Sequence, residues 1–197
     1  MTPQADSVLK LFRSTGAYLQ GHFRLTSGLH SGEYLQSALV LQHPQAAERL
    51  GRMLAAELQP LLKEKPGVVV SPALGGLIIG HEVARALGCR FIFTERDAET
   101  KKMVLRRGFR VEPGEAAVVI EDVITTGGST QDVIETLGEA GAAVLAAGSI
   151  IDRSGGLASV GVRRVALVTL QVAAHYPAEC PLCQQGIPVV KPGSRPA

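Results

Sequence analysis

Short apolar runs alternate with helix-like patterns along the middle of the chain, and this alternation limits the folds that the chain can adopt. The apolar runs predict strands over 67–71, 90–93, 116–120, 144–151 and 165–170. Amphipathic patterns predict helices over 44–58, over 77–87 and from 128 to about 138–141. Strands that alternate with helices are typical of a mostly parallel sheet covered by helices on both faces. The sequence therefore predicts an α/β fold with a core from about 44 to 170.

Three regions do not follow this alternation. The first 40 residues combine a short helical pattern with a stretch rich in Gly, Ser and His over 26–32, and the tail from Ala173 is rich in Pro, Cys and Gln. Both regions suit a small hood over one edge of the sheet, within a single domain that spans 1–197. The charged segment 95–110 predicts a long loop or a hairpin, and long loops in compact domains are often functional.

The composition is that of a globular protein, since 46% of the residues are hydrophobic and 19% are charged. The net charge of +2 is too small to indicate a nucleic-acid or membrane surface. No apolar run approaches the roughly 20 residues that span a bilayer, and the first residues lack a signal-peptide pattern. Three cysteines do not suggest a disulfide framework. We therefore expect a cytoplasmic protein with reduced thiols and with neither nucleic-acid nor membrane partners.

The most informative stretch is 118–130, which reads VVIEDVITTGGST. An apolar strand leads to the carboxylates Glu121 and Asp122, and a turn rich in Thr, Gly and Ser then opens a helix. Open α/β sheets bind ligands beyond the carboxyl ends of their strands, and helix N-termini favour phosphate. Vicinal ribose hydroxyls can donate hydrogen bonds to the two carboxylates. The pattern describes a site for a phosphorylated ribose, and the alternative is a plain strand-turn-helix unit whose Thr and Ser side chains cap the helix.

Two common nucleotide-binding motifs are absent from the sequence. No Gly-Lys pair occurs, so there is no Walker A loop, and no Gly-x-Gly occurs, so the dinucleotide fingerprint is missing too. A phosphate site in this chain must therefore be of another kind.

The stretch 118–130 resembles the phosphoribosyl-pyrophosphate motif of type I phosphoribosyltransferases, in which two acids follow an apolar strand and precede a Thr- and Gly-rich loop. The resemblance implies the fold of that family, with a small hood at one edge of the sheet. It also implies that the two acids hold the ribose hydroxyls and that the loop wraps the 5′-phosphate. The residues that it implies for binding phosphoribosyl pyrophosphate are Arg96, Glu121, Asp122, Val123, Ile124, Thr125, Thr126, Gly127, Gly128 and Ser129, with Thr130 adjoining.

Two further stretches are similar to the members of the family that act on orotate. The first reads FRLTSGLHSGEY over 23–34, and its Tyr34 would lie near the orotate ring. The second reads IIDRSGG over 150–156. Its Arg153 would contact the orotate carboxylate, since a guanidinium can form two parallel bonds with a planar carboxylate. Thr125 would also contact orotate. A half-buried packing role for Tyr34 and a surface position for Arg153 are the alternatives.

Two other segments bear on pyrophosphate. The stretch 71–76, SPALGG, resembles the pyrophosphate-binding loop of the family. Thr26 stands where the family often carries Lys. Some members carry Lys where Gly75 stands, so pyrophosphate must find its positive charge elsewhere in this chain.

The basic segment 96–110 is the expected source of that charge. It resembles the mobile loop that closes over the active site in this family, commonly onto the neighbouring subunit of a dimer. Cations in a closed site would stabilise the charge that builds on the leaving pyrophosphate. The residues favoured for this role are Arg96, Lys101 and Lys102. A solvated basic hairpin is the alternative.

The resemblance implies transfer of the 5-phosphoribosyl group to orotate, which gives orotidine 5′-phosphate and pyrophosphate. It also implies a homodimer and Mg²⁺, with the ion held largely by substrate oxygens and by no dedicated protein site. Lys101, Lys102 and Asp122 are expected to act in catalysis, by direct displacement without a protein nucleophile. The rival functions are a purine- or uracil-specific phosphoribosyltransferase and a non-catalytic sensor of phosphoribosyl pyrophosphate.

Cys180 and Cys183 have the spacing of metal ligands, but a single Cys-x-x-Cys pair is a weak indication of zinc. Within one chain, Cys89 and His175 are the residues expected to complete such a site, and a site shared between two subunits is the other arrangement. The interpretation favoured by the sequence is a structural or incidental role for the cysteines, so no metal ligand is predicted.

Overall fold

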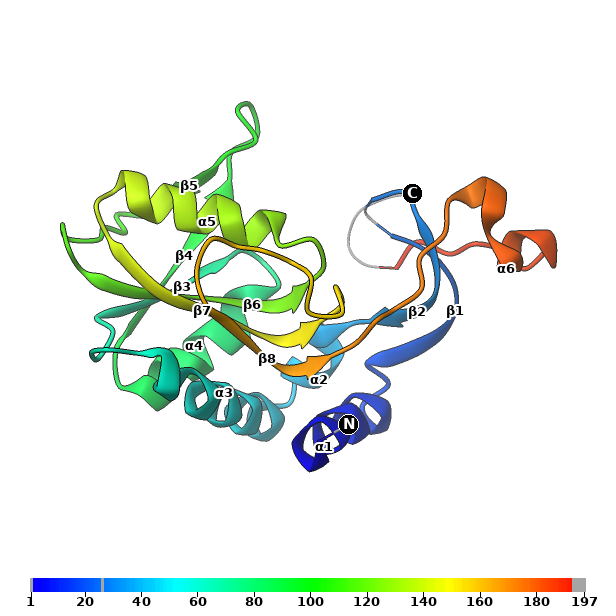
Figure 1. The fold of residues 1–197 in the computed structure, drawn as a ribbon, viewed down its shortest axis with the longest axis horizontal. Helices are drawn as coiled ribbons and strands as arrows, with labels where there is room; N and C mark the ends of the chain where they lie inside the picture. Colours follow the sequence, from blue (N-terminus) through cyan, green and yellow to red (C-terminus); the bar gives the residue numbers. More distant parts are fainter. Residues whose placement is uncertain (1, 26, 193–197) are drawn as a thin grey trace.

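A computed structural model describes residues 2–25 and 27–192, so Thr26 lies outside the described residues. The centre of the molecule is a six-stranded sheet in the order β5-β4-β3-β6-β7-β8 (Figure 1). Neighbouring strands are parallel, except that β4 and β5 are antiparallel. The strands are β3 (Val68–Pro72), β4 (Arg90–Arg96), β5 (Met103–Leu105), β6 (Ala116–Ile124), β7 (Ala143–Asp152) and β8 (Arg164–Thr169). The predicted α/β class with a mostly parallel sheet is confirmed.

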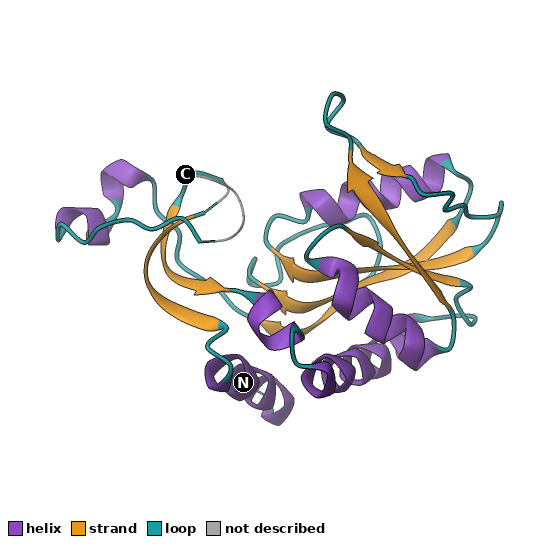
Figure 2. Ribbon diagram, turned by 180° about the vertical axis from the view of Figure 1, so that it is seen from behind, coloured by secondary structure: helices purple, strands orange, loops and turns teal. Residues whose placement is uncertain are grey.

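Helices cover both faces of this sheet (Figures 1 and 2). They are α1 (Pro3–Ser14), α3 (Pro44–Leu58), α4 (Gly76–Leu87) and α5 (Gly128–Glu139). Successive residues of a strand point to opposite faces, so each strand supplies two cores. Val69 and Ile120 pack in the core beneath α1, α3 and α4, whereas Val70 and Val119 pack in the core beneath α5. No helix of the described residues is long and apolar enough to span a bilayer.

The helix ends follow local sequence signals. α3 begins at Pro44 and ends at Leu58, as predicted, because proline is favourable in the first turn of a helix. A short 3-10 turn, Gln59–Leu61, extends it. α4 ends before Gly88, whose φ of 66° lies in the left-handed region that ends many helices.

Two strands extend well beyond their predicted ends, and pairing with a neighbour explains both. β6 continues to Ile124 because it remains paired with β7 as far as Asp152, so the two acids lie within the strand rather than after it. β4 continues to Arg96 because it pairs with β5. The charged segment 95–110 therefore contains a hairpin, one of its two predicted forms.

A second, smaller unit stands beside the sheet. It contains the hood hairpin, formed by β1 (Tyr18–Arg24) and β2 (His30–Leu35), and the tail over 173–192, with a 3-10 turn at Pro177–Glu179 and the short helix α6 (Pro181–Gln184). The short helix α2 (Ser37–Leu41) leads from the hairpin to the core. Figure 1 shows the chain crossing from β8 to the tail, which lies alongside β1 and β2. Helix α1 lies within the range predicted for the hood, but its Val8 and Phe12 pack in the sheet core.

Hydrogen bonds between backbones join the tail to the hood hairpin. Arg24 N donates to Val190 O at 2.9 Å, and Val190 N donates to His22 O at 2.8 Å. His30 and His175 exchange two such bonds, at 2.8 and 2.9 Å. The described part of the tail therefore lies against the hood hairpin.

The close approach of α3 and α4 gives a stability prediction. A Cβ atom at Gly51 would lie 2.5 Å from Glu82 Cβ and 2.8 Å from the Glu82 carbonyl carbon. We expect Gly51→Ala to lower the free energy of unfolding by about 1–3 kcal/mol, because the two helix backbones must separate. The matched control is Gly138→Ala in α5, where no atom lies within 4 Å of the added Cβ. The Gly138→Ala variant should have a free energy of unfolding about 0.5–1 kcal/mol higher than that of the wild type. Urea unfolding of both variants measures the difference, and equal effects would contradict the prediction.

Candidate active site

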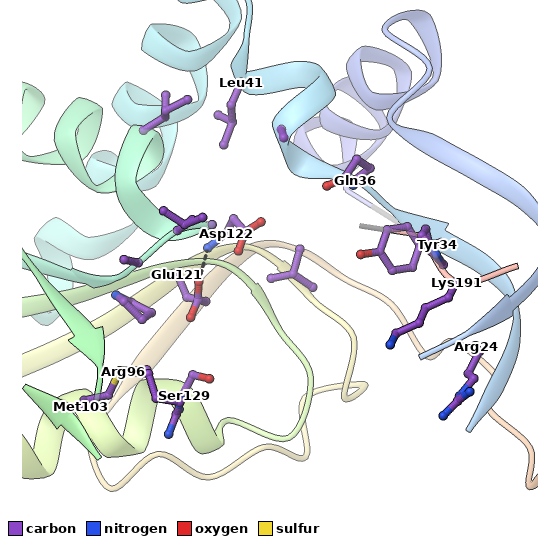
Figure 3. Close-up of a pocket in the computed structure, with 18 residues that line it drawn as sticks. Arg24, Tyr34, Gln36, Leu41, Arg96, Met103, Glu121, Asp122, Ser129 and Lys191 are labelled. Carbon is purple, nitrogen blue, oxygen red and sulfur yellow. Dashed lines mark hydrogen bonds between the residues drawn. The ribbon is translucent and has the colours of Figure 1, made fainter. Parts of the chain in front are cut away.

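A cavity of about 660 Å³ opens at the carboxyl ends of β3, β4 and β6, on the side of the sheet that faces the hood (Figure 3). Open α/β sheets bind their ligands in this position. The sheet contributes the acids of β6 and the loop after β3, while the hood and tail contribute the opposite wall. The lining residues are Arg24, Tyr34, Gln36, Ala38, Leu41, Pro72, Ala73, Leu74, Gly75, Ile78, Arg96, Met103, Glu121, Asp122, Val123, Ser129, Lys191 and Pro192.

Glu121 and Asp122 both line this cavity (Figure 3). Glu121 is buried, and its Oε1 accepts a hydrogen bond of 3.2 Å from Asp122 N. Burial raises the pKa of Glu121 well above its ordinary value, and the neighbouring Asp122 carboxylate raises it further. Two acids in this setting favour a ligand that brings hydroxyl donors or positive charge.

The loop after β6 leaves the N-terminus of α5 available to an anion. Gly127, with a φ of 89°, precedes the helix, and no side chain of the described residues caps its first turn. A Cβ at Gly127 would lie 2.9 Å from Val160 Cγ1, so the position is restricted to glycine by packing as well as by φ. Thr125, Thr126 and Ser129 are exposed beside the free N–H groups. Such a helix N-terminus is suited to phosphate.

The loop after β3 packs directly against the acids. A Cβ at Gly75 would lie 2.6 Å from Asp122 Oδ1, so a side chain at this position would displace the carboxylate. The peptide between Ala73 and Leu74 is cis, and Leu74 is exposed at the cavity. The segment that resembles a pyrophosphate loop thus lies next to the predicted ribose site.

Arg153 is a half-buried cation at the end of β7. Its backbone N donates to Ile124 O at 2.8 Å, while its Nε has no hydrogen-bond partner among the described residues. Burial lowers the pKa of Arg153, and the Tyr34 hydroxyl and Glu33 oppose this effect. Arg153 is not part of the cavity lining. Its charge nevertheless opposes the rise that burial causes in the pKa of Tyr34, and Tyr34 does line the cavity. A buried guanidinium with an unused donor suits an anionic ligand.

Asp152 fixes the turn that carries Arg153. Its Oδ1 accepts from Ser154 N at 2.8 Å and from Ser154 Oγ at 2.6 Å, and its Oδ2 accepts from Gly156 N at 3.1 Å and from Arg164 Nη1 at 2.8 Å. Burial alone would raise the pKa of Asp152, but these bonds from Ser154 and Arg164 outweigh it and hold the pKa below its ordinary value. The ion pair is a scaffold for the turn.

Burial also raises the pKa of Tyr34, and the nearby Asp122 carboxylate raises it further, while Arg153 opposes them. These three side chains, predicted from separate motifs, are therefore close enough to influence one another electrostatically. The Tyr34 ring also lies 5.9 Å from that of Phe23, so packing and ligand contact are both open to it.

Of the three cations predicted from the basic segment to bind pyrophosphate, one lines the cavity. Arg96 lines the cavity and donates to Asp132 Oδ2 at 2.8 Å and to Lys101 O. Lys101 and Lys102 lie in the exposed turn between β4 and β5, outside the cavity lining. Lys101 Nζ donates to Ala98 O. The catalytic roles of Lys101 and Lys102 remain predictions.

Several lining residues were not identified from the sequence. Arg24 comes from the hood hairpin, and Lys191 from the tail, and their separation in the sequence hides their common position. Each bears positive charge, and both face the sheet from the hood side (Figure 3). No local motif marks them, since pairing of the tail with β1 brings them to the site.

The cysteine pair has partners other than those expected. The side chains of Cys180 and Cys183 meet those of His22 and His30, from the hood hairpin. The expectation that Cys89 and His175 would complete the group is wrong. Cys89 follows α4, where its Sγ donates to Ala84 O at 3.9 Å. His175 approaches through its backbone.

Comparison with known proteins places these features in a family. Residues 37–171 match the family model of the phosphoribosyl transferase domain. The chain is 53% identical over 190 residues to the orotate phosphoribosyltransferase of Pelotomaculum thermopropionicum, covering 96% of this chain and 97% of that protein. It is 52% identical over 190 residues to the orotate phosphoribosyltransferase of Heliobacterium modesticaldum, covering 96% and 98%.

Solved structures show the same relationship. Orotate phosphoribosyltransferase from Aeropyrum pernix superposes with a TM-score of 0.68 at 28% identity, covering 83% of this chain and 94% of that chain. Adenine phosphoribosyltransferase from Thermoanaerobacter pseudethanolicus superposes with a TM-score of 0.60 at 18% identity, covering 70% and 88%, and so shares the fold alone.

The family model matches residues 37–171, and the solved structures share the fold. The chain therefore contains a type I phosphoribosyltransferase domain. The relatives that match nearly the whole chain identify the family more narrowly than the domain model does. By them, the chain belongs to the orotate phosphoribosyltransferase family.

The raised pKa of Glu121 gives a prediction about stability. Its protonated form is favoured by folding, so the stability that it contributes is present below the ordinary Glu pKa and is lost as pH rises through the raised value. Glu121→Gln should therefore unfold with a higher free energy than the wild type at neutral pH, by about 1.4 kcal/mol for each unit by which the pKa is raised. The two proteins should converge near pH 4.

Urea unfolding across this pH range measures the difference. The control, Glu139→Gln at the exposed end of α5, should change stability little at any pH. A Glu121→Gln variant less stable than the wild type at neutral pH would contradict the burial argument.

Proposed function

We propose that the chain transfers the 5-phosphoribosyl group from phosphoribosyl pyrophosphate to orotate, forming orotidine 5′-phosphate and pyrophosphate in the biosynthesis of uridine monophosphate. The observation that carries the proposal is the combination of two acids and an uncapped helix N-terminus with Arg153, whose Nε has no hydrogen-bond partner among the described residues. The first two suit a phosphorylated ribose, and the third suits a base that carries a carboxylate. Relatives at about half identity, named orotate phosphoribosyltransferase, support the same reaction.

Each group of residues has a distinct role in this proposal. The loop of Thr125 to Ser129 binds the 5′-phosphate through hydroxyls and N–H groups at the start of α5. Glu121 and Asp122 accept hydrogen bonds from the ribose hydroxyls. As the bond to pyrophosphate breaks, the same carboxylates stabilise the positive charge that develops on the ribose ring.

Orotate is held on the other side of the ribose. Arg153 binds its carboxylate, while Tyr34 and Thr125 contact the base. Arg96, on the cavity wall, attracts pyrophosphate. In this proposal no residue of the cavity lining acts as a nucleophile, since Ser129 and Lys191 are assigned to binding and the two acids to the ribose hydroxyls. The displacement is therefore direct.

Mg²⁺ is part of the proposal. The ion prefers oxygen ligands and is commonly bound by one or two carboxylates together with substrate phosphates. Glu121 and Asp122, both on the cavity wall, fit this preference. When bound, the ion neutralises charge on the pyrophosphate. The cytoplasmic location and the absence of nucleic-acid and membrane partners remain predictions from the sequence.

The first experiment follows the ultraviolet absorbance of orotate with purified protein, phosphoribosyl pyrophosphate and Mg²⁺. Loss of orotate should require both additions. Adenine and uracil, tested in parallel, should not be consumed. A folded protein that binds phosphoribosyl pyrophosphate but consumes no orotate would reject the proposal, and turnover of another base would replace it with one of the rival enzymes.

Substitution of Arg153 tests the assignment of the base. Arg153→Gln should reduce kcat/KM for orotate by about 10- to 150-fold, because a hydrogen-bonded charge typically contributes about 1.5–3 kcal/mol. The KM for phosphoribosyl pyrophosphate should change little. Arg153→Lys keeps the positive charge but not the two parallel donors of the guanidinium, so its kcat/KM for orotate should lie between those of the wild type and the Gln variant. Arg163→Gln, at an exposed arginine nearby in the chain, is the control. Equal losses in the two Gln variants would exclude the role given to Arg153.

The position of Lys101 and Lys102 outside the cavity suggests that they act across a homodimer. We expect the double variant Lys101→Ala/Lys102→Ala and the variant Asp122→Asn to be nearly inactive alone. Co-expressed as mixed dimers, they should recover part of the wild-type activity, since one site then has both an intact hairpin and an intact acid. Sedimentation should show a dimer. No recovery in mixed dimers of proven composition would contradict loop sharing.

A further inference from the structure

Four side chains with metal-binding atoms converge in the hood, away from the cavity. They are His22 of β1, His30 of β2, Cys180 before α6 and Cys183 within α6, and their ligand atoms all lie within 4.8 Å of one another. Figures 1 and 2 show α6 beside the hood hairpin. Residues from the two ends of the chain thus meet at one point, although about 150 residues separate them.

The distances among these atoms are close to those around a tetrahedral ion. His22 Nε2 and His30 Nδ1 are 2.9 Å apart. Cys180 Sγ lies 3.5 Å from His22 Nε2, and Cys183 Sγ lies 3.7 Å from His22 Nε2 and 3.3 Å from His30 Nδ1. Ligands bound to zinc at ordinary Zn–N and Zn–S lengths would be about 3.3–3.8 Å apart. Small shifts would bring the four atoms to a common centre.

The hydrogen-bonding capacity of His22 bears on the group. His22 Nδ1 lies 2.7 Å from Ile187 O. A carbonyl oxygen only accepts, so Nδ1 carries the proton and Nε2 presents its single lone pair to the group. That lone pair can accept one hydrogen bond, yet His30 Nδ1 and the two Sγ atoms all lie around it. A cation at the centre would use the lone pairs of all four residues at once.

The bond from His22 Nδ1 to Ile187 O also has the form of a support for a metal ligand. Histidines that bind metals usually donate their other ring N–H to a carbonyl or carboxylate, which fixes the tautomer and the ring orientation. His22 has this partner in the tail itself.

The described residues of the tail contribute no side chain to either hydrophobic cluster of the sheet. His22, His30 and Cys180 are buried, but none of them belongs to either hydrophobic cluster of the described residues. Three apolar side chains of the tail, Ile187, Val189 and Val190, are exposed to solvent. Small units of this kind are often stabilised by a structural metal.

We propose that His22, His30, Cys180 and Cys183 bind one structural Zn²⁺ ion, which ties the tail to the hood hairpin. A set of two Cys and two His suits zinc in tetrahedral geometry, and four protein ligands leave no open position for chemistry. The ion is separate from the Mg²⁺ of the active site. Its consequence for the cavity is indirect, because the joined segments carry Arg24 and Lys191, which line it.

The first test is the metal content of the full-length protein, purified under reducing conditions without a chelator. Mass spectrometry of the metals should find one zinc per chain. Cys183→Ser should lose the zinc, and Cys89→Ser, at the cysteine outside the group, should keep it. Protein that contains no zinc, and takes up none when zinc is added alone under reducing conditions, would overturn the proposal.

The second test uses the wild-type chain, so that a folding defect of a variant does not decide the result. Cobalt in place of zinc should give the intense visible bands of tetrahedral coordination and a thiolate-to-cobalt charge-transfer band. Without chelator, a thiol reagent should modify Cys89 alone, and after chelation all three cysteines. Weak octahedral bands, or a disulfide between Cys180 and Cys183 in the reduced preparation, would overturn the proposal.

The third measurement concerns the consequence for the cavity. Removal of zinc should lower the melting temperature by several degrees, because the ion binds the folded state and not the unfolded state. It should raise the KM for the substrates more than it lowers kcat, since Arg24 and Lys191 act on binding. The metal and thiol readouts do not depend on the proposed reaction, so a failure of either proposal can be recognised separately.

Discussion

Strand β6 pairs in parallel with β3 on one side and with β7 on the other, so all three strands end at the same edge of the sheet. Three functional segments of the sheet follow these ends. The loop at Gly75 follows β3, the anion loop follows β6, and Arg153 follows β7. The hydrogen bond from Arg153 N to Ile124 O extends the same pairing beyond the last strand residue. The site therefore depends on the register of three apolar strands rather than on contacts among its own polar groups.

The same arrangement carries an electrostatic cost. Because β6 stays paired to Ile124, Glu121 is buried beside Asp122, and the pKa of Glu121 rises. Arg153 has the opposite problem, since it is half-buried with an unused donor. The free protein thus holds a buried pair of acids at the cavity and, near Tyr34, a half-buried guanidinium whose Nε has no hydrogen-bond partner among the described residues. A ligand with a polarised ribose and an acidic base would relieve both, so the cost in stability is recovered on binding.

Local patterns in the sequence were sufficient for the five parallel strands of the sheet and for the motifs that follow them. The run 116–120, for example, is buried and apolar throughout, and the Thr- and Gly-rich turn comes directly after its strand. The length of β6 was not predictable, because it depends on pairing with β7. The contributions of Arg24 and Lys191 were not predictable either. They depend on contacts between the two ends of the chain, which leave no periodic signal.

The two histidines of the metal group illustrate this limit and also explain the form of the hood. His22 and His30 lie eight positions apart on paired strands, and the Cys-x-x-Cys unit lies in the tail, so their meeting is decided by tertiary structure. A two-stranded hairpin by itself is marginally stable in water. Here it forms one wall of the cavity while the sheet forms the other. A tie between hairpin and tail would hold Tyr34, Arg24 and Lys191 in place, although the described residues of the tail add no side chain to the hydrophobic clusters of the sheet.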